Sequence, residues 1–396
     1  MYMHAHYGII FIGGGLSSVL AAYTWLQQGY NKPILIIEQT EQLCGNHTWS
    51  FNQTDILPEA WHTLTSLIDV SWQKYEVQFP KITKTVNIPY HSIASENLAD
   101  KIQKFASQNP LLNIITAQKA NIIHEGNQHL NPVVQMQDGQ EYTADWIIQA
   151  TGVSQNYSDT GYQKFLGLEV ILNEPAYIPH PLIMDATIPQ KDGFRFMYVL
   201  PFEPNRLLIE DTYYSLNSNL DIPHVTEEIY TYAKNKGWNI TDVIRKEQGI
   251  LPIPLQQTRP KPLNDKVLPL GMYADLFHST TGYSLAVNYN FIWQMYPYLN
   301  EKELNIRWYR QLLKFYKSMQ FYRIMNRFLF IAGKTNKRYR FLESFYQRQS
   351  DEVIGRFYAG KSTLKDKMSI FSGKAPFLPS WYMLSSIAGK RTEIKG

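Results

Sequence analysis

Residues 7–38 read YGIIFIGGGLSSVLAAYTWLQQGYNKPILIIE, and this stretch decides the fold. An apolar run over 8–12 ends in three glycines, a helical pattern covers 16–28, and a second apolar run, 33–37, ends at Glu38. Short apolar runs bounded by turn residues predict buried strands, and the longer periodic segment predicts a helix. The order strand, tight turn, helix, strand therefore predicts an α/β fold that opens with a Rossmann-like unit.

The glycine turn has the features of a dinucleotide site. Gly13 permits the tight turn, Gly15 lets the backbone approach a pyrophosphate, and the N-terminus of the following helix offers free N–H groups. Glu38 follows at the distance where an acid binds a ribose hydroxyl, which favours FAD or NAD over NADP. Ser18 replaces the usual third glycine, and its small side chain still permits close packing. The alternative is an ordinary βαβ unit without a ligand. The predicted cofactor contacts here are Gly13, Gly14, Gly15, Leu16, Ser17 and Glu38.

Length and composition bound the class of protein. The 396 residues, 44% of them apolar, suffice for two or three domains. The single cysteine, Cys44, excludes an intramolecular disulfide and a cysteine-based zinc cluster, and no other metal-ligand spacing is found. Residues 1–6 lack the basic segment of a signal peptide, and no run reaches the ~18 apolar residues of a spanning helix. We therefore expect a protein without a secretory signal or a spanning helix.

The charge is distributed unevenly along the chain. Residues 301–396 carry 20 Lys and Arg against 7 Asp and Glu, whereas the preceding 300 residues carry 18 against 27. A basic and aromatic-rich final third fits an anionic partner, either a membrane surface or nucleic acid. The alternative is a solvated helical face. No recognised nucleic-acid-binding motif occurs, so we expect no nucleic-acid partner.

The pattern of elements divides the chain into three regions. Strand and helix candidates in 1–50, 95–155 and 260–300 predict a discontinuous nucleotide-binding domain. Residues 51–94 and 156–259 alternate apolar and polar positions, as an antiparallel sheet does, and 249–255 is an expected strand of that sheet. Residues 301–396 are expected to be mainly helical. A nucleotide domain interrupted by a substrate-binding sheet is typical of two-domain flavin enzymes.

Two adjacent carboxylates stand inside an apolar and aromatic strand. Glu210 and Asp211 follow Leu207-Leu208-Ile209 and precede Thr212-Tyr213-Tyr214. Alternation along a strand directs them to opposite faces. A carboxyl group in an apolar site has a raised pKa and can donate a proton near neutral pH. The alternative is that both are paired with Arg206 or Arg195.

Two further segments fit a flavin site. The apolar strand 146–150 ends in Thr151-Gly152, and a glycine near a second helix start, Gly282, follows Thr280-Thr281. His47 and His278 lie beside these elements, although a lone histidine is more often a packing residue. The additional predicted cofactor contacts are His47, Thr151, Gly152, Thr280, Thr281, Gly282 and Tyr283.

Four sequence islands resemble the bacterial lycopene beta-cyclases. They appear in order and span most of the chain. Ser18 and Ser279, which stands where proline is expected, are departures from the family pattern. The islands are 13–16 with 45–51 (GNHTWSF); 184–187, 194–196 and 200–201 with 206–214 (RLLIEDTYY); 249–254 (GILPIP) with 276–284 (LFHSTTGYS); and 356–360 (RFYAG) with 366–367 and 373–374.

The resemblance implies an enzyme that binds FAD and closes beta-ionone rings on lycopene to give beta-carotene. The reaction has no net redox, yet the family requires reduced flavin, with NAD(P)H as the usual electron source. Glu210 would be the catalytic acid, with Asp211 beside it. Because lycopene or a related linear carotene resides in the bilayer, the resemblance also implies peripheral docking, through 301–396, on the cytoplasmic face of the membrane.

Other functions remain consistent with parts of the pattern. An FAD-dependent monooxygenase of the same two-domain architecture would act on an apolar substrate and insert oxygen. A carotenoid or lipid carrier would bind its ligand and return it unchanged. The sequence leaves open whether one or both substrate ends are cyclised, which reductant serves, whether Glu210 or Asp211 donates the proton, and the oligomeric state.

Overall fold

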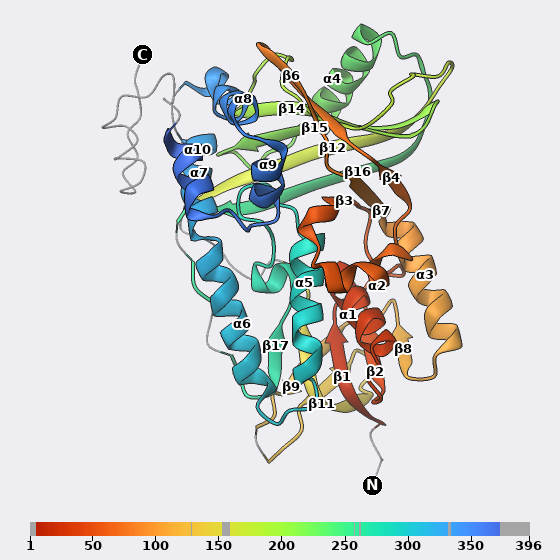
Figure 1. The fold of residues 1–396 in the computed structure, drawn as a ribbon. Coiled ribbons are helices and arrows are strands. Elements are labelled where there is room, and N and C mark those ends of the chain that lie inside the picture. The colour runs from red at the N-terminus through yellow and green to blue at the C-terminus, as the bar shows by residue number, and fades with distance from the viewer. Residues whose placement is uncertain are drawn as a thin grey trace.

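The computed structural model describes residues 5–127, 129–152, 159–256, 258–260, 263–331 and 334–372. These residues form two seven-stranded sheets and one three-stranded sheet. Figure 1 shows the first sheet at the end of the molecule that carries the N-terminus and the second sheet at the opposite end. Helices of the C-terminal region run along one side and connect the two ends (Figure 1).

The first sheet is built around the opening strand. β1 lies between β2 and β11 in parallel register, because Ile9, Ile10 and Phe11 are fully buried and need cover on both faces. The order is β8-β2-β1-β11-β10-β9, and β17 also pairs with β11. The strands are β1 Ala5–Ile12, β2 Ile34–Ile37, β8 Leu112–Ile115, β9 Ala120–His124, β10 Val133–Met136, β11 Glu141–Gln149 and β17 Val267–Pro269.

The second sheet is mainly antiparallel and has the order β16-β12-β15-β14-β13-β5-β6. Its long central strands alternate side chains between two covered faces. The strands are β5 Tyr75–Phe79, β6 Ile82–Val86, β12 Thr160–Leu172, β13 Leu182–Asp185, β14 Phe194–Glu203, β15 Arg206–Ser215 and β16 Ile240–Pro254. The third sheet has the order β3-β7-β4, with β3 Thr48–Asn52, β4 Val70–Trp72 and β7 Tyr90–Ala94.

Helices cover both faces of the second sheet. Val225 and Ile229 of α4 join a core with Leu166 of β12 and Ile209 of β15. On the other face, helices α7 to α9 join a separate core that contains Leu208. The helices are α1 Leu16–Gln27, α2 Trp61–Thr65, α3 Ser95–Gln108, α4 Ile222–Asn235, α5 Leu285–Met295, α6 Leu304–Ser318, α7 Gln320–Phe330, α8 Tyr339–Arg348, α9 Asp351–Tyr358 and α10 Leu364–Ser372.

The structure corrects one predicted boundary. The strand expected over 249–255 begins nine residues earlier, as β16 from Ile240. The polar run 245–248 obscured the alternation, because its inward side chains, Arg245 and Glu247, pair with other polar groups instead of packing on apolar ones. Among the described residues, no helix is long and apolar enough to cross a membrane.

Candidate active site

The glycine turn after β1 is crowded at Gly13 and open at Gly15. Gly13 adopts a positive φ of 98°, and a Cβ there would lie 2.7 Å from the carbonyl oxygen of Ala150, so only glycine fits. By contrast, a Cβ on Gly15 or Gly152 would meet no atom within 4 Å. Helix α1 begins at Leu16 and has no acidic residue in its first turn. The N-terminus of this helix, with open space beside Gly15, offers N–H donors of the kind that bind a phosphate, while the carboxylate of Glu38 already accepts from the turn at Gly14.

Glu38 lies against the same turn. Its Oε2 accepts a hydrogen bond of 2.6 Å from the backbone N–H of Gly14, and its Oε1 accepts bonds of 2.9 Å from the N–H and the hydroxyl of Thr40. These bonds hold the carboxylate at the edge of the glycine turn. Thr151 follows the neighbouring strand, where its Cα would lie 3.3 Å from a Cβ on Gly13. The structure thus brings Gly13, Glu38 and Thr151 together.

The loop 278–284 is joined to this turn through two helices. The Ser17 hydroxyl of α1 donates a 3.0 Å hydrogen bond to the side chain of Asn288 in α5, the helix that follows the loop. Gly282 has a φ of 75°, and a Cβ there would lie 2.8 Å from Leu251 of β16 and would also collide with Gln163 of β12. The loop therefore packs directly on the second sheet and bridges it to the glycine turn.

His278 holds the shape of this loop. Its Nδ1 accepts hydrogen bonds of 3.3 and 3.2 Å from the N–H groups of Thr280 and Thr281, and its Nε2 lies 3.0 Å from the carbonyl oxygen of Phe357. Burial lowers the pKa of His278 to about 3, so the ring is neutral. His47 is fixed through its backbone N–H, 3.0 Å from the Ser95 hydroxyl, and burial lowers its pKa as well. Both histidines make the contacts of packing residues.

Glu210 is on the face of β15 that the C-terminal helices and the 278–284 loop cover. The Glu210 side chain lies deep within the protein but is not completely buried. The Thr212 hydroxyl donates to its Oε1, and Tyr198 of β14 lies directly opposite in the register. Burial, followed by the negative charge of Glu247, raises the pKa of Glu210 to about 8. A carboxyl group in this state is protonated at neutral pH and can act as a general acid.

Asp211 is on the opposite face and is fully buried. The Arg195 Nε and Nη2 donate to its two oxygens at 2.8 and 2.7 Å, and the Tyr213 hydroxyl adds a bond of 2.9 Å. Although burial disfavours the charged guanidinium, hydrogen bonds to Asp211 raise the pKa of Arg195. Of the two pairings considered from sequence, Arg195 thus holds Asp211, while Arg206 pairs with Glu169 and Glu203 and not with Glu210. The structure separates the two predicted catalytic carboxylates.

Three tyrosines, two of them buried and Tyr283 partly buried, form a chain from the residue opposite Glu210 to the loop. The Tyr90 hydroxyl lies 3.0 Å from that of Tyr198 and 3.1 Å from that of Tyr283. Burial raises the pKa of all three well above the usual value, so their hydroxyls stay neutral. Tyr90 and Tyr198 were not singled out from sequence, because nothing in strands 108 residues apart marks two tyrosines as hydrogen-bonded neighbours.

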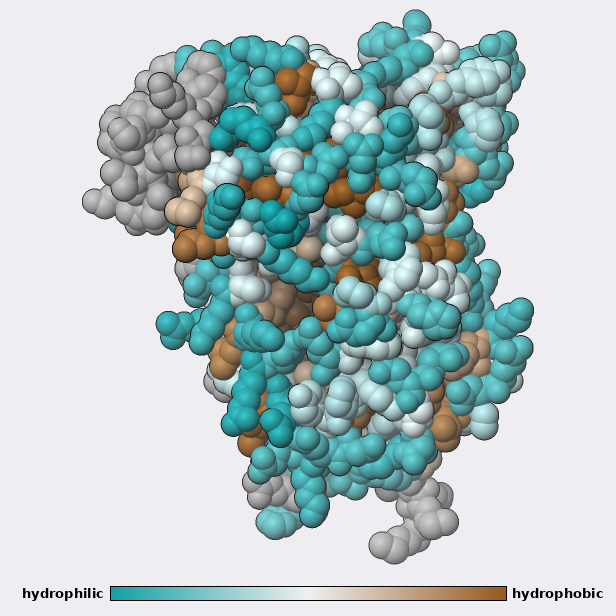
Figure 2. Space-filling view, viewed as in Figure 1, coloured by the Kyte–Doolittle hydropathy of each residue, from teal (hydrophilic) through white to brown (hydrophobic). Residues whose placement is uncertain are grey.

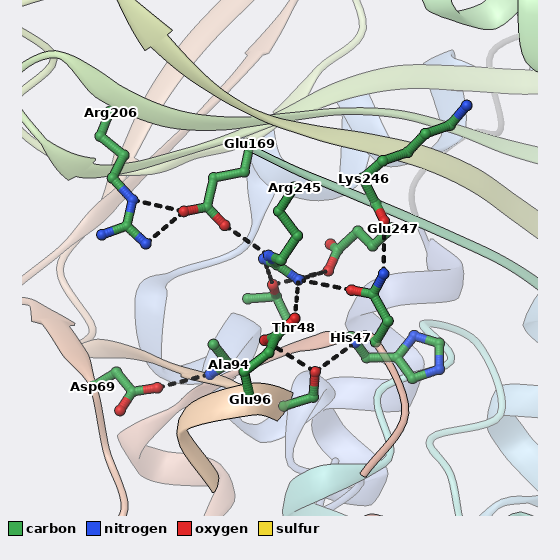
Figure 3. Close-up of polar contacts among 12 residues, drawn as sticks. His47, Thr48, Asp69, Ala94, Glu96, Glu169, Arg206, Arg245, Lys246 and Glu247 are labelled. Carbon is green, nitrogen blue, oxygen red and sulfur yellow. Dashed lines mark hydrogen bonds and ion pairs between the residues drawn. The ribbon is translucent and has the colours of Figure 1, made fainter. Parts of the chain in front are cut away.

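A polar cluster joins the same sheet face to the segment 46–48 (Figure 3). Arg245 donates to Glu169 at 2.7 Å, to Glu247 at 2.8 Å and to the Thr48 hydroxyl at 2.6 Å. Glu169 also accepts a bond of 2.6 Å from Arg206. Sequence reasoning missed Arg245 and Glu247; the available signal was their i, i+2 spacing, which places both on one face of a strand.

The fold and the glycine turn define the class of protein. A geranylgeranyl bacteriochlorophyll reductase-like protein from Thermoplasma acidophilum has a similar structure, with a TM-score of 0.61, 12% sequence identity, and 94% of this chain and 97% of the other covered. A probable FAD-dependent monooxygenase from Pseudomonas aeruginosa has a TM-score of 0.56 and 14% identity, with 90% of this chain and 99% of the other covered. The predicted α/β fold of the Rossmann-type flavoproteins is confirmed.

The sequence comparisons narrow this class to one family. The family model described as lycopene cyclase protein matches residues 8–385. The lycopene beta-cyclase of Pantoea ananas is 36% identical over 378 residues, which cover 94% of this chain and 96% of the relative. That of Paracoccus sp. is 30% identical and covers 93% and 94%. The chain belongs to the lycopene cyclase family, and the resemblance inferred from the four islands is confirmed.

Proposed function

We propose that the protein is a lycopene beta-cyclase, which closes beta-ionone rings on lycopene by acid catalysis without net redox. The observation that carries this proposal is Glu210, whose burial raises its pKa to about 8 on the sheet face that the 278–284 loop covers. The names of the bacterial relatives, which match over nearly their whole length, support the same reaction. Sequence and site therefore point to one chemistry.

FAD is the cofactor that the turn fits. Gly13 forms the tight turn, the open space beside Gly15 and Gly152 would admit a pyrophosphate, and Glu38 would hold a ribose hydroxyl. The loop with Thr280, Thr281, Gly282 and Tyr283 would hold the flavin ring between the turn and the second sheet. When bound in its reduced, anionic form, the flavin would supply negative charge that stabilises a positively charged intermediate. NAD(P)H is the proposed electron source.

Glu210 is the proposed proton donor. Protonation of a terminal double bond of the polyene makes a carbocation, the neighbouring double bond closes the ring, and loss of a proton from ring carbon gives the beta-ring. Tyr198, directly opposite Glu210, and Tyr214 on the same face offer aromatic faces to the cation. Asp211 cannot serve equally, because Arg195 and Tyr213 occupy both of its oxygens. We assign Asp211 the positioning of the strand.

The membrane-docking surface is proposed at the C-terminal helices. On α10 the side chains of Leu364 and Met368 are 74% and 58% exposed, one turn apart, beside Lys365 and Lys367. Figure 2 shows apolar surface on the flank where α7 and α10 lie in Figure 1. Exposed apolar side chains next to lysines suit insertion at an anionic bilayer surface. The cytoplasmic face is proposed because reduced nicotinamide is found there.

The test is production of the protein in cells that accumulate lycopene, followed by analysis of the extracted pigment. We expect beta-carotene from the native chain and unchanged lycopene from Glu210→Gln. If lycopene persists although the folded flavoprotein accumulates, the assignment is wrong. Product mass also separates the alternative, an FAD-dependent monooxygenase, which the fold of the Pseudomonas aeruginosa neighbour suggests. A monooxygenase product gains oxygen, whereas a cyclised carotene has the mass of lycopene.

A further inference from the structure

A second carboxylate lies near Glu210 in the second sheet, in the same row, meaning the set of residues that lie opposite one another across neighbouring strands. Glu247 of β16 is opposite Gly167 of β12, and Gly167 is opposite Glu210 of β15. Residues that are opposite one another in neighbouring strands direct their side chains to the same face, and two strand spacings amount to about 10 Å. The only residue between the two carboxylates in this row therefore has no side chain.

Gly167 provides the space into which Glu247 leans. A Cβ on Gly167 would lie 2.9 Å from Cγ and 3.2 Å from Oε1 of Glu247. The side chain of Glu247 thus crosses over β12 in the direction of β15, with Oε1 above the glycine. The next row on the same face, which contains Glu169 of β12, has no such gap, because the ion-paired side chain of Glu169 fills it.

The other oxygen of Glu247 is held in place. Its Oε2 accepts hydrogen bonds of 2.9 Å from the Thr48 hydroxyl and 2.8 Å from Arg245 (Figure 3). Burial raises the pKa of Glu247, but the charge of Arg245 and the bond from Thr48 act against that rise. In the part of the chain that the structure describes, Glu210 accepts from the Thr212 hydroxyl and forms no ion pair with a cation. Of the two carboxyl groups, Glu247 is therefore the one that ionises first.

We propose that Glu247 is a positioning residue for the reaction, whose anchored carboxylate, leaning over Gly167, keeps Glu210 in the protonated form that donates to the substrate. The inference rests on the proposed cyclase function and deepens it. The other titratable groups that interact with Glu210 are Asp211, on the far face and already paired with Arg195, and the tyrosines Tyr198 and Tyr214. These tyrosines are neutral, and Arg195 balances the charge of Asp211. Arg245 is shared between Glu247 and Glu169, so it balances the charge of Glu247 only in part, and Glu247 supplies the remaining negative charge on this face.

The first test is the pH dependence of cyclisation by Glu247→Gln, measured on the FAD-loaded protein in carotene-containing vesicles. We expect the loss of activity at high pH to move down by about one pH unit, which means about tenfold lower activity at alkaline pH and nearly native activity at low pH. A loss of equal size at every pH, or an unchanged profile, would overturn the proposal. Glu203→Gln, at an exposed carboxylate of the same sheet, is the matched control and should leave the profile unchanged.

A second variant moves the charge without deleting it. In Gly167→Ala the added Cβ would displace Glu247, because it would stand 2.9 Å from Cγ. The alkaline limb should again move to lower pH, by less than in Glu247→Gln. If a folded Gly167→Ala protein loses cyclisation at the same high pH as the native protein, the proposed effect of Glu247 on Glu210 across Gly167 is wrong.

A spectroscopic measurement separates this proposal from the function itself. The carbonyl stretch of protonated Glu210, identified by its absence in Glu210→Gln, is followed by infrared difference spectroscopy during a pH titration without substrate. We expect its midpoint to fall by about one pH unit in Glu247→Gln. An unmoved midpoint overturns the role of Glu247 even if the protein cyclises lycopene. Failure of the native protein to cyclise overturns the proposed function but leaves this titration interpretable.

Discussion

Glu210 and Asp211 are neighbours in the chain, yet the two faces of β15 give them different chemistry. Asp211 meets a guanidinium, a phenol and an apolar core under α4. Glu210 accepts from a hydroxyl, lies opposite a glycine, and interacts electrostatically with a second carboxylate two strands away. One carboxylate is fully paired, and the other is left with its proton. The comparison shows that the identity of the adjacent strand residues, and not burial alone, decides which carboxyl group can act as an acid.

The largest effect is expected when the acid itself is removed. Glu210→Gln keeps the size of the side chain but cannot donate a proton to carbon, so we expect cyclisation to fall by about 10²–10⁴-fold. Flavin content and the unfolding transition should remain close to those of the native protein. The measurement is product formation per flavoprotein, and substantial turnover by this variant would contradict the assignment of Glu210 as the acid.

Breaking the ion pair of Asp211 with Arg195, on the other face of β15, should lower the stability of the protein. Among the described residues, Asp211→Asn leaves the buried guanidinium of Arg195 with Glu228 as its one remaining acidic partner, at 2.8 Å. We expect the free energy of unfolding to fall by roughly 3 kcal/mol in urea denaturation, as for other broken buried ion pairs. Replacing both partners, with Arg195→Met and Asp211→Leu, should recover most of this loss. A folded Asp211→Asn protein that is as stable as the native one would contradict the structural role.

The pH dependence sharpens the comparison without any substitution. Because the pKa of Glu210 is raised to about 8, its proton is present at lower pH and is lost as the pH rises through this value. We expect cyclisation to fall about tenfold for each further pH unit above about 8. Native-state ionisation of Glu210 is also unfavourable, so stability should decline as the pH rises from the ordinary value of 4.5 to about 8. A cyclisation rate that stays constant as the pH rises above about 8 would refute the assignment of Glu210.

The smallest changes in stability and rate are expected when one tyrosine hydroxyl is removed on either face of β15. Tyr90→Phe removes the bridge between Tyr198 and Tyr283 beside Glu210, and Tyr213→Phe removes a donor to Asp211. Each should lower the free energy of unfolding by about 1–2 kcal/mol. Only Tyr90→Phe should also lower the cyclisation rate, by less than about tenfold, and equal rates in the two variants would show that the tyrosine network has no part in catalysis.

The sequence predicted the elements of the site better than their contacts. The glycine turn and the Glu210–Asp211 strand depend on local patterns, namely glycine spacing and alternation, which are visible in one segment. The contacts of Glu247 with Thr48, and of Tyr90 with Tyr198, join residues 199 and 108 positions apart. Both contacts join the three-stranded sheet, through β3 and β7, to the second sheet, through β16 and β14. How two sheets pack against each other is not encoded in a local pattern.

The discontinuity of the first sheet has a consequence for biosynthesis. β17 pairs with β11 only after the whole second sheet has been made, with Val267 opposite Ile147. At typical elongation rates the segment from Gly13 to Gly282 takes roughly 15–50 s to leave the ribosome. During this interval the turn that opens the chain has no partner loop to enclose a ligand. Flavin availability at the end of translation, and not at its start, should therefore set how much of the nascent protein matures.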